Sequence, residues 1–222
     1  MANRIGIDIG GTFTDIVMLR DSGQFLVYKE DSTPDDPLRA ISQGLAGLSD
    51  EIGSTVEDLL ASTEILVHGQ TMATNALIQR AGPVVGLLGT EGFRDVLHLG
   101  RGLKPERFNI HLQKPEDFIP RFLRLGIPGR ITATGAEETP LDEAAVREAA
   151  ETFRQHQVKA VAIAYLWSIL DPTHEHRTAE IIREEMPGVD VLCSSDILPE
   201  IREWERTSST VLSAYIAPII GK

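Results

Sequence analysis

A glycine-rich turn near the start of the chain carries the residue types best suited to chemistry. It lies in the segment Ile5-Gly6-Ile7-Asp8-Ile9-Gly10-Gly11-Thr12-Phe13-Thr14-Asp15. Adjacent glycines leave backbone N–H groups uncovered, and such groups can bind phosphate oxygens. Thr12 and Thr14 can add hydroxyl donors. We predict a phosphate site at Gly10, Gly11, Thr12 and Thr14; the alternative is a tight turn whose threonines bond only the turn itself.

Two carboxylates flank this turn. Asp8 can hold Mg²⁺ directly or through water, because Mg²⁺ prefers oxygen ligands and keeps several waters. Asp15 is a second carboxylate close by. The turn is neither a dinucleotide fingerprint nor a Walker loop, because G-x-G-x-x-G is absent and no lysine follows the glycines.

A second polar segment is His68-Gly69-Gln70-Thr71-Met72-Ala73-Thr74-Asn75-Ala76-Leu77. It indicates a strand that ends at a glycine and a helix that begins among hydroxyl groups. Helix N-termini attract anions, Thr71 can cap this helix, and His68 can act as an acid or a base. The alternative for Thr71, Thr74 and Asn75 is a structural capping cluster.

A third segment precedes the end of the chain. On a helix, Arg202 and Arg206 share one face, as do Glu203 and Thr207. Arg206 with Thr207 and Ser208 can bind an oxyanion, and the alternative is a solvated face of i,i+4 pairs.

Two other patterns favour structural roles. His174-Glu175-His176 is not expected to hold one ion, because residues two apart on a helix point in different directions. Cys193 is the only cysteine, and it follows an apolar strand-like stretch. We expect a buried side chain there and not a nucleophile.

The elements that position these residues follow from periodicity and turn signals. The sequence predicts a β-meander over residues 4–28, followed by alternating helices and strands. A loop-rich insertion with an edge strand is expected at about 100–130. Helices are expected to begin at Asp36-Pro37, at Thr139 as the cap residue, at Asp171-Pro172 and after Leu198, and a further helix is expected at 71–80. Strands are expected at 64–68, 83–88, 158–167 and 189–193. This is an α/β fold with a mixed sheet and flanking helices.

Composition limits the class of protein. The 222 residues carry a formal net charge of -12, with 42% hydrophobic and 24% charged residues, which are values of a folded globular chain. No basic run is present, so we expect no binding to nucleic acid or to anionic membranes. The single cysteine fits a reducing compartment, and no apolar leader is evident, so we expect a cytoplasmic protein.

Together the segments resemble the N-terminal domain of the hydantoinase A / 5-oxoprolinase family, including the related subunit of acetone and acetophenone carboxylases. The resemblance is carried by 7–15, 68–77, Gly92-Phe93-Arg94-Asp95 with Gly100-Arg101, and 203–211. Gln70 stands where the family usually has threonine, and Trp204 where tyrosine is usual. Family members are several times longer and carry a second glycine-rich phosphate motif, which this sequence lacks after Gly11.

The resemblance implies an actin-like ATPase (ribonuclease H-like) lobe, with residues 1–222 forming the nucleotide-binding half. It implies that Asp8 and the Gly10-Gly11-Thr12 turn lie at the phosphates of Mg-ATP. The implied reaction is ATP-dependent opening of a cyclic amide, such as a hydantoin, 5-oxoproline or a lactam, through phosphorylation of a carbonyl or enolate oxygen. Asp15 and His68 are the candidate catalytic residues.

Partners and rival functions follow from the same resemblance. The implied partners are the remaining domains of the subunit and a second, hydantoinase B-type subunit, so this stretch alone is expected to have little activity. One rival is a sugar or carboxylate kinase of the same fold, which releases a stable phosphorylated product. The other rival is a non-catalytic assembly module that binds no nucleotide.

Overall fold

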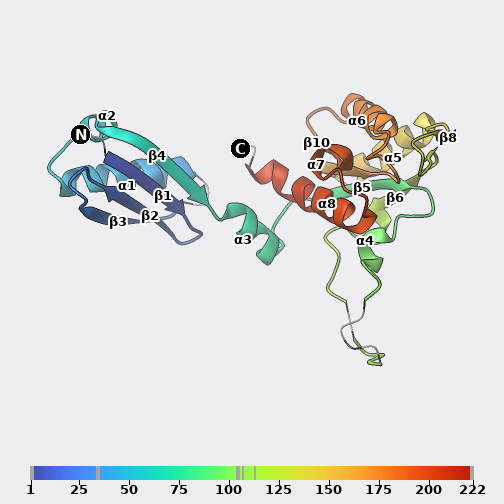
Figure 1. Ribbon diagram of the computed structural model, residues 1–222, viewed down its shortest axis with the longest axis horizontal. Coiled ribbons are helices and arrows are strands. Elements are labelled where there is room, and N and C mark those ends of the chain that lie inside the picture. The colour runs from blue at the N-terminus through green and yellow to red at the C-terminus, as the bar shows by residue number, and fades with distance from the viewer. Residues whose placement is uncertain (1–2, 34–35, 104–105, 107, 113, 221–222) are drawn as a thin grey trace. The chain divides into compact units, whose positions relative to one another are not determined.

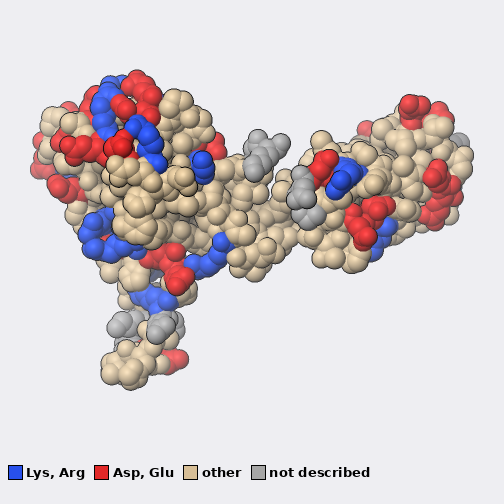
Figure 2. Space-filling view, turned by 180° about the vertical axis from the view of Figure 1, so that it is seen from behind, with Lys and Arg blue, Asp and Glu red and all other residues tan. Residues whose placement is uncertain are grey.

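The chain forms two compact units, residues 1–79 and 80–222, and each contains its own four-stranded sheet (Figure 1). The computed structural model describes residues 3–33, 36–103, 106, 108–112 and 114–220. No helix among the described residues is both long and apolar enough to cross a membrane. On the face drawn in Figure 2, acidic and basic side chains intermingle and form no continuous basic patch.

The first unit is a mixed sheet in the order β3-β2-β1-β4, in which β1 pairs antiparallel with β2 and parallel with β4. The predicted β-meander is therefore confirmed. The elements are β1 (Asn3–Ile9), β2 (Phe13–Leu19), β3 (Phe25–Asp31), α1 (Pro37–Glu51), α2 (Val56–Ala61), β4 (Thr63–Gln70) and α3 (Met72–Gln79).

Helices α1 and α2 supply the apolar side chains that bury one face of this sheet. The strands alternate, so every second side chain points into the core. Leu38, in the first turn of α1, is 71% exposed, and the buried residues of this helix begin at Ala40. The core consists of Ile5, Ile7, Ile9, Ile16, Met18, Leu45, Leu48 and Leu59.

The second unit is built on a parallel sheet in the order β10-β9-β5-β6. Helices α5 and α6 pack against each other, and α8 packs on β9 and β10. A small antiparallel pair, β7 and β8, precedes α5. The elements are β5 (Val85–Thr90), α4 (Val96–Leu99), η1 (Arg121–Leu123), β6 (Arg124–Ile127), β7 (Arg130–Ile131), β8 (Glu137–Thr139), α5 (Glu143–Gln155), β9 (Ala160–Ala164), α6 (Thr173–Glu185), β10 (Asp190–Cys193), α7 (Ser194–Ile197) and α8 (Glu203–Ile220).

Two sequence-based expectations need correction. One mixed sheet was expected, but β5, β6, β9 and β10 form a separate parallel sheet. A strand–helix–strand pattern in the sequence does not reveal where one sheet ends and the next begins. The cap of α5 is Asp142, whose carboxylate accepts a hydrogen bond from the N–H of Ala145 at 3.0 Å. Thr139, the expected cap, belongs to β8.

Loops predominate in the described part of residues 100–130. This part contains no regular element between α4 and η1 and ends in β6, which is an edge strand as expected. Residues 104, 105, 107 and 113 lie outside the described part.

Candidate functional site

The turn between β1 and β2 is closed by its own backbone. The N–H of Gly10 donates to the carbonyl of Phe13 at 2.9 Å, which leaves Gly11 and Thr12 at the exposed tip. Within the described residues, the N–H groups of Gly11 and Thr12 donate no hydrogen bond. Two neighbouring free donors at an exposed turn are a suitable site for an oxyanion.

Thr14 has a different role from the one predicted. Its side chain is fully buried, and its hydroxyl lies 3.0 Å from that of Ser32. The Ser32 hydroxyl in turn donates to the carbonyl of Gly10 at 2.8 Å. Thr14 therefore braces the turn from the core side and does not present a donor to a ligand. Ser32 was not predicted, because it lies 18 residues away from Thr14 in the sequence.

Asp8 and Asp15 do lie together. They are cross-strand partners in the β1–β2 ladder, so both side chains point to the face opposite the core. Asp15 forms an ion pair with Lys29 at 2.9 Å, whereas Asp8 is exposed and makes no ion pair among the described residues. Gly69 on β4 is the neighbour of Asp8, and no other group lies within 4 Å of the position that a Cβ on Gly69 would take. The Asp8 carboxylate thus faces open space.

The second polar segment meets the first at the turn. The N–H of Thr71 donates to the carbonyl of Ile9 at 3.2 Å, which fixes the start of α3 beside Gly10. The Asn75 amide donates to the Thr71 hydroxyl at 3.3 Å and lies so close to Gly11 that a Cβ there would be 3.1 Å from Asn75 Nδ2. Thr71 and Asn75 therefore form one wall of the turn, while Thr74 is exposed.

His68 does not join the two carboxylates. It is the β4 neighbour of Ile7, whose side chain belongs to the core face, and Asp8 and Asp15 point to the other face. The imidazole is exposed at the sheet edge. The two predicted catalytic residues, Asp15 and His68, are thus on opposite faces of the sheet.

Arg206 is buried and does not lie on a solvated face. It is 1% exposed because α8 packs on β9 and β10. Its guanidinium donates to Ser194 Oγ at 3.0 Å and to the carbonyls of Glu200 and Tyr165 at 2.8 Å each. Thr207 is buried beside it. The sequence spacing was correct, but it could not show which side of α8 is covered.

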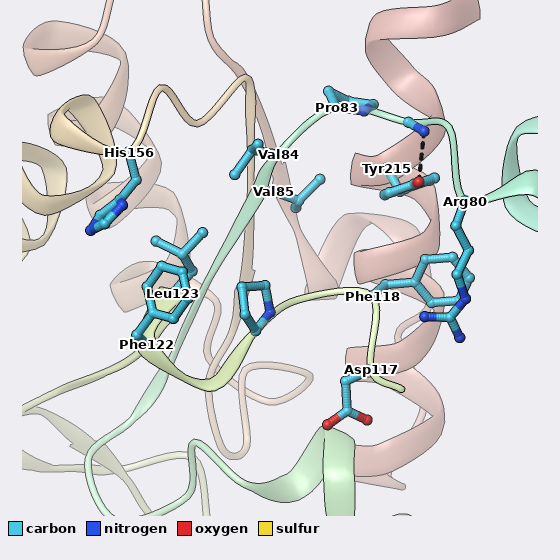
Figure 3. A pocket seen from close by; sticks show the side chains of 12 residues that line it. Arg80, Pro83, Val84, Val85, Asp117, Phe118, Phe122, Leu123, His156 and Tyr215 are labelled. Carbon is cyan, nitrogen blue, oxygen red and sulfur yellow. Dashed lines mark hydrogen bonds between the residues drawn. The ribbon is translucent and has the colours of Figure 1, made fainter. Parts of the chain in front are cut away.

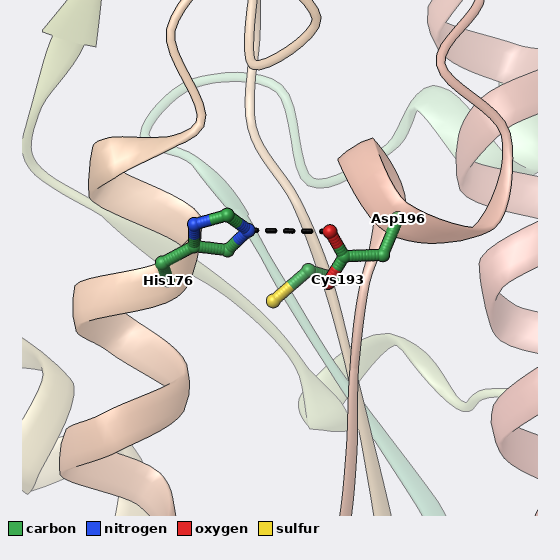
Figure 4. Close-up of side chains that lie close together, drawn as sticks. All are labelled: His176, Cys193 and Asp196. Carbon is green, nitrogen blue, oxygen red and sulfur yellow. Dashed lines mark hydrogen bonds and ion pairs between the residues drawn. The ribbon is translucent and has the colours of Figure 1, made fainter.

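The residues of the His174-Glu175-His176 segment diverge, as predicted. His174 contacts Glu137 at 2.7 Å, and Glu175 points into the core. His176 lies 3.2 Å from Asp196 and close to Cys193, and the donor atoms of these three side chains lie within 4.8 Å of one another (Figure 4). A metal ion at this cluster requires a deprotonated thiol.

We expect Cys193 to be unreactive in the folded chain. Burial, with Glu175 and Asp196 nearby, raises the pKa of the thiol to about 12. At pH 8 only about one thiol in ten thousand is therefore ionised, and the thiolate is the reactive form. A colorimetric disulfide reagent should label the chain only after unfolding in guanidinium. Rapid labelling of the native chain contradicts the burial that we assign to Cys193.

A separate cleft of about 430 Å³ in the second unit contains none of the predicted site residues (Figure 3). The Tyr215 hydroxyl accepts a hydrogen bond from the N–H of Gly82 at 2.6 Å. The carboxylate of Asp117, which lines the cleft, already binds Arg124 at 3.0 Å and His98 at 2.8 Å. Because its walls are mainly apolar, this cleft offers few polar groups for chemistry.

Known proteins resemble this chain along nearly its whole length. A family model described as the hydantoinase/oxoprolinase N-terminal region matches residues 4–186. The caprolactamase subunit alpha of Pseudomonas jessenii is 42% identical over 221 residues, which are 99% of this chain and 32% of that protein. The acetophenone carboxylase gamma subunit of Aromatoleum aromaticum is 39% identical over 96% of this chain and 31% of its own length.

A solved structure gives the same result for the fold. The crystal structure of the ATP-dependent caprolactamase from Pseudomonas jessenii superposes with a TM-score of 0.87 at 42% identity. The match covers 98% of this chain and 32% of that chain. The chain thus spans about a third of the length of the curated relatives above.

Proposed function

We propose a function from the premise that this chain belongs to the hydantoinase/oxoprolinase N-terminal family. It supplies the phosphate-binding part of an ATP-dependent enzyme that opens a cyclic amide. The observation that carries the proposal is the exposed turn at Gly11 and Thr12, which follows the strand that carries Asp8. Among the described residues, the N–H groups of Gly11 and Thr12 donate no hydrogen bond and the Asp8 carboxylate makes no ion pair. The name of the caprolactamase structure, which includes ATP dependence, supports the choice of nucleotide.

The residues at the turn fit Mg-ATP. The N–H groups of Gly11 and Thr12 would donate to phosphate oxygens, and Asn75 would close the side of the turn. Asp8 would hold Mg²⁺ through its carboxylate or through water, because it is exposed and faces open space beside Gly69. Residues 1–222 would then form one lobe of an actin-like ATPase.

The chemistry that ATP supplies when bound is a transferable phosphoryl group. In our proposal its acceptor is a carbonyl or enolate oxygen of the amide. The turn donors would bind the negative charge on the phosphate oxygens, and donors fixed before the reaction stabilise such charge most effectively. Asp15 is a weak candidate for a general base because Lys29 already neutralises it.

Partners are part of the proposal. Two of the relatives are named as single subunits of larger enzymes, a caprolactamase subunit alpha and a carboxylase gamma subunit. We therefore propose that this chain acts with further domains of its own subunit and with a second subunit of the hydantoinase B type.

Calorimetric titration of Mg-ATP into the chain tests the proposed site. We expect millimolar or tighter binding that Asp8→Asn weakens roughly tenfold, which corresponds to about 1.4 kcal/mol. Asp21→Asn is the matched control, because Asp21 is exposed at the β2–β3 turn on the same unit. Binding that Asp8→Asn leaves unchanged contradicts the site, and absence of binding favours an assembly module. Release of a stable phosphorylated substrate favours a kinase.

A further inference from the structure

A second cavity, of about 630 Å³, lies at the carboxyl ends of the parallel strands in the second unit. Three of its lining residues come shortly after strand ends: Phe93 after β5, Arg130 after β6 and Trp167 after β9. The first turn of α8, with Glu203 and Trp204, closes the remaining side.

The strand order places this cavity where parallel sheets bind ligands. From β5 the chain continues to β6 on one side, and it then crosses to β9 on the other side of β5. Because the connections on the two sides run in opposite directions, a crevice opens between the ends of β5 and β9, and such crevices are the usual ligand sites of open α/β sheets. Phe93 and Leu166 line the cavity from these two strand ends.

The walls offer flat, apolar surface. Trp167 and Trp204 are the two tryptophans of the chain, and both line this cavity. Trp167 has a φ of 60°, a left-handed conformation that is rare for a bulky residue. Such backbone strain is concentrated at ligand sites in known proteins.

The charges in the lining are unequal. Arg101 and Arg202 share one carboxylate, Glu205, at 2.5 Å and 3.8 Å. Arg130 lies over the ring of Phe93 at 5.6 Å and makes no ion pair with any described carboxylate. Three arginines and two glutamates give the lining one net positive charge, although the whole chain carries -12.

We propose that this cavity binds a small anion with a flat ring, either a ring carboxylate or a ring phosphate ester. The ring would pack against Trp167 and Trp204, and the oxyanion would bind Arg130. A guanidinium fork matches the two oxygens of such a group and can donate two parallel hydrogen bonds. Glu203 is the opposing charge in the lining, so it weakens the binding of an anion. The site is separate from the nucleotide turn and does not depend on the function proposed above.

Tryptophan fluorescence of the full chain tests this proposal, because the only tryptophans are in the cavity wall. Benzoate, phenyl phosphate and the neutral analogue benzamide are titrated separately. We expect both anions to change the fluorescence saturably and benzamide to bind at least tenfold more weakly, the loss typical of a hydrogen bond to a charged group. The stronger of the two anions identifies the oxyanion.

Two variants change the affinity for the anions in opposite directions. Arg130→Gln should weaken it roughly tenfold, and Glu203→Gln should strengthen it roughly two- to fivefold. Arg147→Gln is the control for a lost arginine. This substitution on α5 removes an exposed ion pair with Glu185 of α6. Asp8→Asn should leave benzoate binding unchanged, which separates this site from the nucleotide turn.

Three results overturn the proposal. The first is a fluorescence that neither anion changes. The second is benzamide binding as tight as benzoate binding. The third is an affinity for the anions that is the same in Arg130→Gln and Glu203→Gln as in the unmodified chain, with the far-ultraviolet circular dichroism of both variants showing that they are folded.

Discussion

Glu175→Gln should destabilise the second unit by about 3–5 kcal/mol, the usual loss when one partner of a buried charge pair is removed. Glu175 is fully buried on α6, and its carboxylate accepts hydrogen bonds from the N–H groups of Tyr165 and Ser195 and from the hydroxyl of Ser194. That hydroxyl also accepts from Arg206. Ser194 therefore connects a buried carboxylate to a buried guanidinium.

The substitution removes the charge and keeps the shape. Each oxygen of the Glu175 carboxylate accepts a hydrogen bond from a backbone N–H group. Glutamine has only one side-chain oxygen, so its NH₂ group faces one of these backbone N–H groups, which loses its acceptor. Burial lowers the pKa of Arg206, and the charge of Glu175 opposes that shift. Without this charge, the buried positive charge of Arg206 is less well compensated. Both effects reduce the free energy of unfolding.

Denaturant unfolding followed by tryptophan fluorescence measures this change, because Trp167 and Trp204 both belong to the second unit. Glu180→Gln is the matched control on the same helix. Its carboxylate is exposed in an ion pair with Arg177, so its loss should cost at most about 1 kcal/mol. The double variant Glu175→Gln with Arg206→Met should lose less than the sum of the two single variants. Equal stability of Glu175→Gln and Glu180→Gln contradicts the role assigned to the buried pair.

This buried network shows what sequence patterns leave undetermined. The i,i+4 spacing correctly placed Arg206 on one face of a helix, but an exposed face and a buried face have the same spacing. Glu175 lies in a segment so polar that its complete burial has no local signal. Their partners Tyr165 and Ser194 lie just after β9 and at the start of α7, and only the packing of these elements brings them together.

The turn was predictable because its interactions are local. Two strands joined by a short glycine turn must place Asp8 and Asp15 opposite each other, and the ladder confirms it. The position of α3 beside the turn was not predicted, because it depends on the parallel pairing of β4 with β1. The role of Thr14 was missed because its partner, Ser32, follows the next strand and is recognisable only once the register of β2 and β3 is known.

Gly10→Ala should abolish measurable binding of Mg-ATP, a loss of roughly two orders of magnitude or about 2.7 kcal/mol. A Cβ on Gly10 would lie 2.8 Å from the carbonyl oxygen of Phe13, which is part of the backbone and cannot rotate away. The same oxygen accepts the hydrogen bond that closes the turn. Relief of the clash must therefore open the turn and displace the N–H groups of Gly11 and Thr12.

Gly6→Ala is the control for the added methyl group, because Gly6 lies on β1, the strand that leads into Gly10, and no other group lies within 4 Å of the Cβ position of Gly6. This variant should bind Mg-ATP like the unmodified chain. Hydrogen exchange at the Gly10 amide gives a second measurement that needs no nucleotide, and exchange should become faster only in Gly10→Ala. If Gly10→Ala leaves both the exchange rate and the Mg-ATP affinity unchanged, the closed turn is not what positions the phosphate donors. Faster exchange with unchanged affinity would instead show that the closed turn exists but that the phosphate site lies elsewhere on the chain.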